Sequence, residues 1–201
     1  MMDWTAFEDQ ARAEGYTCIC GIDEAGRGPL AGPVYAAAVV LRPGQVIEGV
    51  NDSKKLSEKK REALFDTICS QCAAYGIGSA TEKEIDEINI LNATYLAMQR
   101  AVAALPVQPD CALVDGNRAP DLPLEVRTII KGDAQSASIA AASILAKVRR
   151  DRYMLQMAEK YPQYAFEKHK GYGTKLHYER LEQYGISPIH RLSFLKKWMN
   201  R

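Results

Sequence analysis

Two adjacent carboxylates stand at the end of a short apolar segment near the N-terminus. Residues 17–22 predict a β-strand, and Asp23 and Glu24 follow it, with the loop Gly26-Arg27-Gly28 close behind. A buried pair of carboxylates is costly unless a cation or a proton compensates it, and hard divalent cations such as Mg²⁺ prefer oxygen ligands. Glycines let backbone N–H groups approach a ligand closely, and arginine suits a phosphate. The segment therefore favours a metal-assisted reaction on a phosphate-containing substrate.

The geometry of a strand limits what this pair can do together. Neighbouring residues of a regular strand point to opposite faces. Asp23 and Glu24 can share one metal ion only if the strand breaks between them, or if Glu24 also uses its backbone carbonyl. A hairpin with surface acids is an equally good interpretation of this segment alone. A dinucleotide-binding loop is disfavoured, because Gly32 comes one residue late for that motif and Pro29 stands where a helix would begin.

Two further acids repeat the arrangement of an apolar segment, a carboxylate and a turn. Asp115 follows a strand predicted at 111–114. Asp133 follows a strand predicted at 124–130, and we interpret it as the N-cap of a helix over 134–160. Each alone is more often a plain turn or cap residue. Four acids at element ends, with no obligate Cys or His partner, favour a site for a hard cation over a zinc site. Two such ions in one site can promote phosphodiester cleavage.

Other kinds of site find less support in the sequence. There is no G-x-S-x-G elbow of a serine hydrolase, and the five cysteines, including Cys69-x-x-Cys72, predict reduced thiols in the core. The three histidines are not spaced as a zinc set. His169 could contact phosphate or assist proton transfer, although a surface histidine is the commoner case. Lys54 and Lys55 could meet phosphates from a loop, although solvated lysines are commoner.

Composition and charge limit the class of protein and of partner. The chain has 201 residues, of which 47% are hydrophobic and 25% charged, which suffices for a substantial core. The apolar runs are too short to span a membrane and the polar start is not a signal peptide, so we expect a cytoplasmic protein. No exposed apolar stripe is evident, so we expect a monomer by default. Residues 1–145 carry 13 Lys/Arg and 20 Asp/Glu, a difference of −7, whereas residues 146–201 carry 13 and 5, a difference of +8. This asymmetry favours a polyanionic partner, with a solvated basic helix face as the alternative.

The elements that must position these residues predict a mixed α/β sheet. Strands at 17–22, 34–41 and 73–80 follow one another closely enough to form an antiparallel meander. The later strands at 111–114 and 124–130 need crossover helices, so we expect them to be parallel.

Helix signals separate the predicted strands. Ser57 is the expected N-cap of a helix that ends near residue 72, and Thr81-x-x-Glu84 is a capping box that opens a helical region reaching residue 105. Residues 134–160 form a helix rich in small side chains, which let it lie close to the sheet.

Six segments together resemble the ribonuclease HII family, the type 2 ribonucleases H of bacteria. They occur in the family order and span most of the chain: GIDEAGRGPLAGPV at 21–34, DSKKLS at 52–57, LVDGN at 113–117, IIKGDAQSASIAAASILAKVRRDR at 129–152, HKGYGTK at 169–175 and PIHRLSF at 188–194. The resemblance implies a ribonuclease H-like mixed sheet of five strands flanked by helices. It further implies a catalytic domain over 1–165 and a basic, helical C-terminal extension over 166–201 packed on it.

The resemblance also implies an activity. Members of the family are endonucleases that need Mg²⁺ or Mn²⁺, cleave the RNA strand of RNA–DNA hybrids by two-metal-ion hydrolysis, and cut 5′ of a single ribonucleotide in duplex DNA. The implied metal-binding and catalytic acids are Asp23, Glu24, Asp115 and Asp133.

Recognition of the substrate is likewise implied by the resemblance. The loop Gly26-Arg27-Gly28 would read the 2′-hydroxyl of the ribonucleotide, the one group that distinguishes RNA from DNA at a nucleotide. The ring of Tyr172 would pack on the sugar at the following junction, where an extra hydroxyl would not fit. The basic C-terminal part would add phosphate contacts that salt weakens.

Two alternatives stay open at this point. A non-catalytic nucleic-acid-binding module would explain the charge asymmetry, but four costly acids beside a polyanion serve no purpose without a metal. Another metal nuclease of the same fold, such as a resolvase or a transposase-like enzyme, would cut all-DNA substrates. Around Arg150 and Leu192 the sequence is less typical of the family, and we assign neither residue a part in the reaction.

Overall fold

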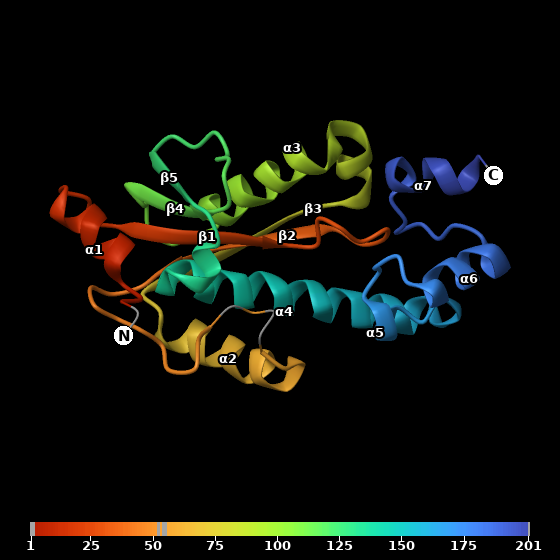
Figure 1. Ribbon diagram of the computed structural model, residues 1–201, viewed down its shortest axis with the longest axis horizontal. Helices are drawn as coiled ribbons and strands as arrows, with labels where there is room; N and C mark the ends of the chain where they lie inside the picture. The colour runs from red at the N-terminus through yellow and green to blue at the C-terminus, as the bar shows by residue number, and fades with distance from the viewer. Residues whose placement is uncertain (1–2, 52, 54–55, 201) are drawn as a thin grey trace.

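A computed structural model describes residues 3–51, 53 and 56–200. Its centre is a five-stranded sheet in the order β3-β2-β1-β4-β5 (Figure 1). The strands are β1 Ile19–Ala25, β2 Val34–Val40, β3 Ala74–Ala80, β4 Cys111–Asp115 and β5 Glu125–Ile129. The first three strands pair antiparallel, whereas β4 and β5 run parallel to β1. The predicted mixed sheet is therefore confirmed.

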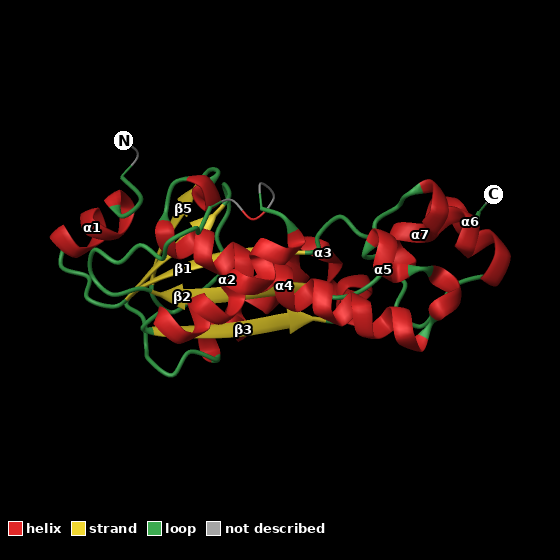
Figure 2. Ribbon diagram, turned by 90° about the horizontal axis from the view of Figure 1, so that it is seen from below, coloured by secondary structure: helices red, strands yellow, loops and turns green. Residues whose placement is uncertain are grey.

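Helices cover both faces of the sheet and bury a separate hydrophobic cluster on each. On one face lies α3, Glu82–Ala103; on the other lie α4, Ala137–Lys160, and α2, Glu58–Gln71 (Figures 1 and 2). Successive residues of β1 point alternately to the two faces of the sheet. Ile22 packs in the cluster under α3, whereas its neighbour Gly21 faces α4. The short helix α1, Ala6–Ala13, lies beside β1 and β4.

Small residues let the two long helices lie very close to the strands. A Cβ atom on Gly21 would stand 2.3 Å from the backbone nitrogen of Ile139 in α4. On the other face, a Cβ on Gly78 of β3 would stand 2.3 Å from the carbonyl oxygen of Ala97 in α3. The close packing of α4 agrees with the prediction from its small side chains.

Helix starts agree with the sequence signals except at one position. Ser57 caps α2 and the Thr81–Glu84 capping box opens α3, as expected. The prediction of Asp133 as the cap of α4 is wrong. Asp133 lies in a 3-10 turn, Gly132–Ala134, and α4 begins three residues later, where the Ser136 side chain accepts a hydrogen bond from Ile139 N.

The C-terminal part packs at one end of the sheet and of α4 (Figure 1). It consists of α5 Phe166–His169, α6 Lys175–Tyr184 and α7 Leu192–Met199. Backbone hydrogen bonds from Leu30 N to Gly171 O (2.8 Å) and from Arg191 N to Leu30 O (2.8 Å) tie it to the loop after β1. A domain boundary at residue 165 remains a prediction. Among the described residues, no helix is long and apolar enough to cross a membrane.

Candidate functional site

Strand register places two of the predicted acids side by side. Ile22 of β1 pairs in parallel with Val114 of β4, and each is followed directly by a carboxylate, Asp23 or Asp115. Parallel strands present their carboxyl ends at the same edge of the sheet, which is where ligands bind in open α/β folds. Because β1 and β4 are neighbours, the two acids meet at that edge although 92 residues separate them in sequence.

The turn Gly132–Ala134, which follows β5 and contains Asp133, reaches the same edge of the sheet. The N–H of Gly132 donates a hydrogen bond to Asp115 Oδ1 at 2.6 Å. Asp133 follows directly, is 5% exposed, and belongs to the 3-10 turn after β5. The structure thus brings Asp133 into the neighbourhood of Asp115, but Asp133 is not among the residues that line the pocket described below.

The Asp23 carboxyl group lies in an environment that disfavours its negative charge. Burial, followed by the nearby charges of Glu24 and Asp115, raises the pKa of Asp23 well above its usual value. Two donors act in the opposite direction: the N–H of Glu24, at 2.7 Å, and the hydroxyl of Ser143 in α4. A carboxylate cluster held in this way is stabilised by a bound cation.

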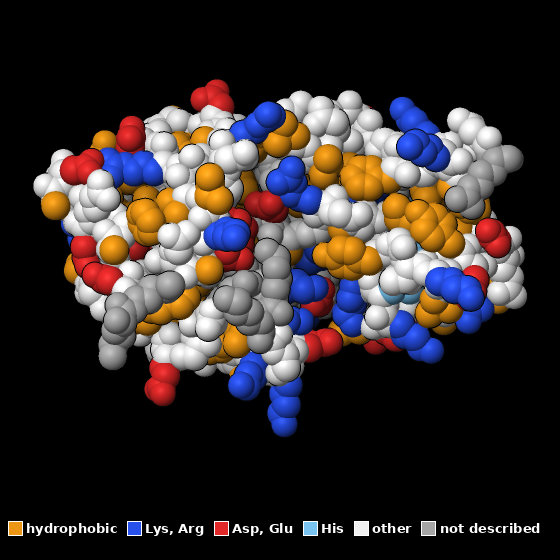
Figure 3. All heavy atoms as spheres, in the orientation of Figure 1, with side chains coloured by type: hydrophobic (Ala, Val, Ile, Leu, Met, Phe, Trp, Pro, Cys, Tyr) orange, Lys and Arg blue, Asp and Glu red, His pale blue; other side chains and the backbone are white. Residues whose placement is uncertain are grey.

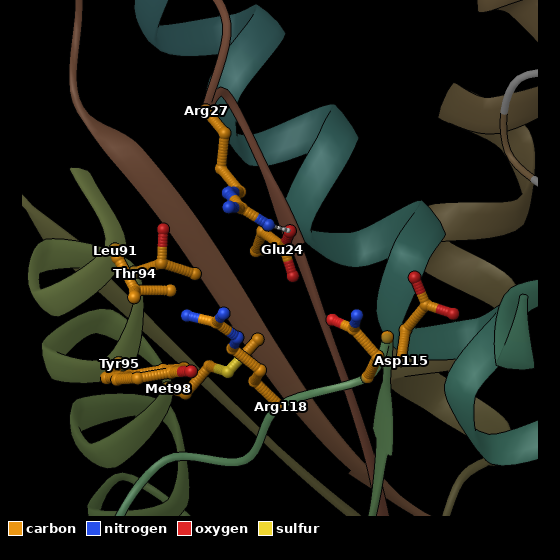
Figure 4. Close-up of a pocket in the computed structure, with 10 residues that line it drawn as sticks. Glu24, Arg27, Leu91, Thr94, Tyr95, Met98, Asp115 and Arg118 are labelled. Carbon is orange, nitrogen blue, oxygen red and sulfur yellow. Dashed lines mark hydrogen bonds and ion pairs between the residues drawn. The ribbon is translucent and has the colours of Figure 1, made fainter. Parts of the chain in front are cut away.

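Asp23 and Glu24 lie toward opposite faces of the sheet, because β1 stays paired with β2 as far as Ala25. The strand does not break between the two acids. A pocket on the α3 side includes Glu24, Arg27 and Asp115 but not Asp23. In Figure 4 the Arg27 guanidinium points at Glu24, 3.5 Å from its carboxylate, while Asp115 points away toward α4.

A second pocket unites most of the predicted site residues. It has a volume of about 240 Å³ and is lined by three acids, the glycine-rich loop, an aromatic ring and polar side chains of α4: Asp23, Glu24, Ala25, Gly26, Arg27, Gly28, Ser53, Asp115, Ser143, Lys147 and Tyr172. The loop and the ring face each other, since a Cβ on Gly28 would lie 3.8 Å from Tyr172 Cε1. Residues from five distant segments of the chain therefore form one concave site.

Lys and Arg side chains surround a hollow on the molecular face drawn in Figure 3, and acidic side chains are visible within it. Such a distribution attracts a polyanion while keeping carboxylates at the centre.

Sequence reasoning missed three polar side chains of this pocket. Ser53 and Ser143 are both buried, with their hydroxyl oxygens 2.8 Å apart, so Ser53 extends the hydrogen-bond chain that ends at Asp23. Lys147 lies one helical turn beyond Ser143 and donates to Asp151 Oδ1 at 2.6 Å. The spacing of Ser143 and Lys147 in the small-residue helix was the signal that could have indicated a common face.

Two buried arginines were also missed, and they hold the loop that lines the pocket. Arg191 donates hydrogen bonds to the carbonyl oxygens of residues 26, 27 and 32, and Arg150 to those of residues 31, 33 and 170. Both side chains are fully buried. Burial, followed by repulsion from Arg150, lowers the pKa of Arg191 to about 9.

Among the remaining predicted binding residues, His169 is the one that the structure describes, and it is not among the residues that line the pocket. Lys54 and Lys55 lie outside the described residues. The expected surface position of His169 is wrong, because the residue is only 7% exposed. Its Nδ1 accepts a hydrogen bond from Gly171 N, and its Nε2 lies 3.0 Å from Tyr164 O. Both ring nitrogens are therefore engaged with backbone groups of the protein.

The site suits a hard metal ion by its chemistry. Three carboxylates line one pocket, and burial, followed by the charges of Glu24 and Asp115, raises the pKa of Asp23. Within the part of the chain that the structure describes, no three His, Cys, Asp or Glu side chains converge closely enough to form a ready-made metal cage. Mg²⁺ typically uses only one or two carboxylates together with water and substrate oxygens, which agrees with such an open site.

Comparison with known proteins identifies the family of this site. The family model described as Ribonuclease HII matches residues 20–197. The chain belongs to the ribonuclease HII family. Curated ribonucleases HII from Caldicellulosiruptor bescii and a Marinomonas species are 59% and 62% identical to it. These alignments cover 94% and 88% of this chain, and 92% and 89% of the relatives. The chain is therefore an endoribonuclease of the ribonuclease HII type.

Solved structures agree with this assignment. Ribonuclease H2 from Pyrococcus horikoshii has a TM-score of 0.73 and 31% identity, covering 88% of this chain and 93% of that one. A ribonuclease HII from Archaeoglobus fulgidus, solved in complex with PCNA, has a TM-score of 0.68, 28% identity and coverage of 88% and 94%. The ribonuclease H-like sheet with helical C-terminal part is thus shared with ribonucleases HII of solved structure.

Proposed function

We propose that this chain cleaves the RNA strand of RNA–DNA hybrids and nicks duplex DNA on the 5′ side of a single embedded ribonucleotide. The observation that carries the proposal is one pocket whose lining includes Asp23, Glu24 and Asp115 together with the loop 26–28 and Tyr172. The acids supply chemistry, and the loop and ring supply recognition.

In the proposed mechanism, Asp23, Glu24 and Asp115, with Asp133 close by, would hold two divalent ions, Mg²⁺ or Mn²⁺. Such ions, when bound, would supply positive charge that stabilises the attacking and the leaving oxygen of a phosphodiester. Asp23 is kept in place by Ser143, and Asp115 by the N–H of Gly132. Pre-organised ligands lower the reorganisation that binding requires.

Recognition of the ribonucleotide rests on the gap between the loop and the ring. Gly28 carries no side chain toward Tyr172, so its backbone is open beside the ring and can reach a 2′-hydroxyl. Tyr172 is 45% exposed and lines the pocket, with the Arg150 guanidinium 5.7 Å from its ring centroid, so we assign the rest of its ring to the next sugar. A deoxyribose packs against such a ring, whereas a ribose would bring an additional hydroxyl into the contact.

Phosphate contacts would come from cations around the pocket. The side chain of Arg27 is half exposed, and the ammonium of Lys147 lies at the α4 wall. Arg27 can donate two hydrogen bonds to one phosphate, whereas Lys147 contributes a compact positive charge. Lys54 and Lys55 stay predicted phosphate contacts. The cytoplasmic location and the monomeric state are likewise proposals from the sequence.

The decisive experiment uses a labelled DNA duplex that contains one ribonucleotide, with an all-DNA duplex as the control. Each is incubated with the protein in Mg²⁺, in Mn²⁺ and in chelator. We expect a metal-dependent nick 5′ of the ribonucleotide and an intact control, and no nick with Asp23→Asn. Cleavage of the all-DNA control would indicate a general metal nuclease. Binding without any cleavage would indicate a non-catalytic module.

A further inference from the structure

Three buried histidines lie behind Tyr172, and the proposed reaction uses none of them. His169, His177 and His190 are 7%, 0% and 3% exposed. They gather around Phe166, whose ring centroid is 5.7–5.8 Å from each imidazole. Burying three imidazoles costs hydration free energy, which apolar residues of the same size would not lose. The cluster therefore indicates that the hydrogen bonds of these imidazoles have a role.

His190 and His177 form a hydrogen-bonded chain that ends at Tyr172. Ser187 N donates to His190 Nδ1 at 2.9 Å, the Nε2 atoms of His190 and His177 are 2.9 Å apart, and His177 Nδ1 lies 2.9 Å from the Tyr172 carbonyl oxygen. The chain connects the turn before α7, the helix α6 and the residue whose ring lines the pocket. No step in it exceeds ordinary hydrogen-bond length.

The end groups of the chain determine the tautomer of both rings. A backbone N–H can only donate, so His190 Nδ1 accepts and, in the neutral ring, its proton is on Nε2. His190 Nε2–H therefore donates to His177 Nε2. The proton of His177 is then on Nδ1, where it donates to the carbonyl of Tyr172, which can only accept. One assignment satisfies every donor and acceptor.

His169 fixes the turn that precedes Tyr172. Its Nδ1 accepts from Gly171 N at 3.1 Å, its carbonyl accepts from Tyr172 N at 2.9 Å, and its ring stacks on that of His177 at 4.3 Å. Lys170 and Gly171 both have positive φ, so the backbone makes a sharp left-handed turn here. The imidazoles thus hold the backbone on both sides of Tyr172.

The neutral state of the chain agrees with its surroundings. Burial, followed by the neighbouring histidines, lowers the pKa of His177 and of His190 to about 4. At pH 7 both rings are neutral, which is the state that the hydrogen-bond chain requires.

We propose that His177 and His190 are positioning residues that set the place of the Tyr172 ring against the substrate. Tyr172 is 45% exposed and the Arg150 guanidinium lies 5.7 Å from its ring centroid, so the place of the ring depends on this contact and on the backbone that His177 anchors. The inference rests on the proposed recognition of the ribonucleotide junction by Tyr172. It assigns the C-terminal part a role in specificity in addition to phosphate binding.

The test compares two variants at one position on two substrates. His177→Leu removes the donor to Tyr172, whereas His177→Asn retains a donor near the place of Nδ1. The kcat/KM values are measured on a duplex with one ribonucleotide and on an all-RNA–DNA hybrid. We expect His177→Leu to lower the ratio of kcat/KM on the single-ribonucleotide duplex to kcat/KM on the hybrid by about tenfold. A small misplacement of the Tyr172 ring near the reacting groups is enough for such a loss. His177→Asn should restore the ratio to within about threefold of the wild type.

A Tyr172→Ala background separates positioning from a general structural role. There, His177→Leu should leave the ratio unchanged, because the ring that it positions is absent. An equal loss in both backgrounds, or a wild-type ratio in folded His177→Leu, would overturn the proposal. Absence of single-ribonucleotide cleavage by the wild-type protein would instead overturn the proposed function on which it rests.

A measurement on the wild-type protein keeps the proposal testable if His177→Leu does not fold. Nitrogen-15 chemical shifts of the imidazoles report which nitrogen carries the proton. We expect protonated Nδ1 in His177 and protonated Nε2 in His190 at pH 7. The opposite tautomer in His177 would leave the Tyr172 carbonyl without its donor and would contradict the proposed chain.

Discussion

The Arg191 guanidinium donates a hydrogen bond to the carbonyl oxygen of Gly26 at 2.6 Å, across 165 positions of the chain. The same group binds the carbonyls of Arg27 at 3.0 Å and Gly32 at 2.8 Å. One planar side chain therefore fixes both ends of the loop that faces the substrate. Backbone carbonyls surround this charge, so its cost in hydration is offset by hydrogen bonds to a charged donor.

Replacing Arg191 should loosen the loop and destabilise the fold. We expect Arg191→Gln to lower the free energy of unfolding by about 3 kcal/mol, because several buried hydrogen bonds to a charged group are lost. Cleavage of the single-ribonucleotide duplex should fall at the same time. Arg191→Lys should recover little, since an ammonium lacks the planar fork. Urea unfolding and kcat/KM measure the two effects.

A matched control separates burial from charge. Lys197, in the same C-terminal part, is exposed, and Lys197→Gln removes the same charge. Its effect on unfolding should stay within about 0.5 kcal/mol. Equal losses for the two variants would show that the net charge of the tail, and not the buried hydrogen bonds, is what matters.

The two glycines of the loop should respond differently to alanine. Gly26 has a φ of +104°, and a Cβ there would stand 2.2 Å from Arg150 Nε, so Gly26→Ala should destabilise the fold by more than about 1 kcal/mol. Gly28→Ala meets only Tyr172 at 3.8 Å and should unfold like the wild type. Its methyl group narrows the gap to the ring, so cleavage at a single ribonucleotide should fall by about tenfold. Unchanged cleavage by folded Gly28→Ala would argue against recognition in this gap.

Asp23→Asn should abolish cleavage yet stabilise the metal-free protein. The raised pKa of Asp23 means that the folded state binds its proton more strongly than the unfolded state. The stabilisation by this proton is present at low pH and is lost as the pH rises through the folded pKa. In chelator at pH 8 the variant with the neutral Asn should therefore have a higher Tm than the wild type. Its activity should fall by more than about 100-fold, because removing a metal ligand costs more than removing a residue that only hydrogen-bonds to one.

Divalent metal should reverse this difference. Mn²⁺ binds the folded state and should raise the Tm of the wild-type protein more than that of Asp23→Asn. Thermal unfolding in chelator and across a Mn²⁺ titration measures both parts. An equal rise in the two proteins would indicate that Asp23 is not a metal ligand.

Much of the active edge could be predicted because it depends on local signals. Asp23 lies near the end of β1 and Asp115 is the last residue of β4, and parallel pairing of these strands brings the two acids together. The sequence predicted each acid at a strand end, but it did not predict that β1 and β4 are neighbours. The N-cap of α4 could not be chosen in this way. Asp133 and Ser136 are both good caps, and the choice depends on the left-handed Lys131 that starts an intervening 3-10 turn.

The buried cations could not be predicted from charge. The excess of Lys and Arg after residue 145 indicates a surface for phosphates, yet Arg150 and Arg191 are fully buried and bind backbone carbonyls. The expected surface position of His169 was wrong for the same reason. Whether a polar side chain reaches solvent depends on the packing of segments that are far apart in sequence, and no local pattern records it.

The histidine chain also predicts how stability depends on pH. Because the folded pKa values of His177 and His190, about 4, lie below the unfolded value near 6.5, protons bind more strongly to the unfolded state in between. The stabilisation is fully present above pH 6.5 and is lost as the pH falls toward 4. Between pH 7 and pH 5, protonation of each ring in the unfolded state should lower the free energy of unfolding by up to about 2 kcal/mol. Acidification acts on Asp23 in the opposite direction.

Urea unfolding in the Asp23→Asn background removes that opposing effect. There, addition of His177→Asn should make the loss between pH 7 and pH 5 smaller by about 2 kcal/mol, whereas an unchanged pH dependence would show that His177 does not titrate as its burial requires.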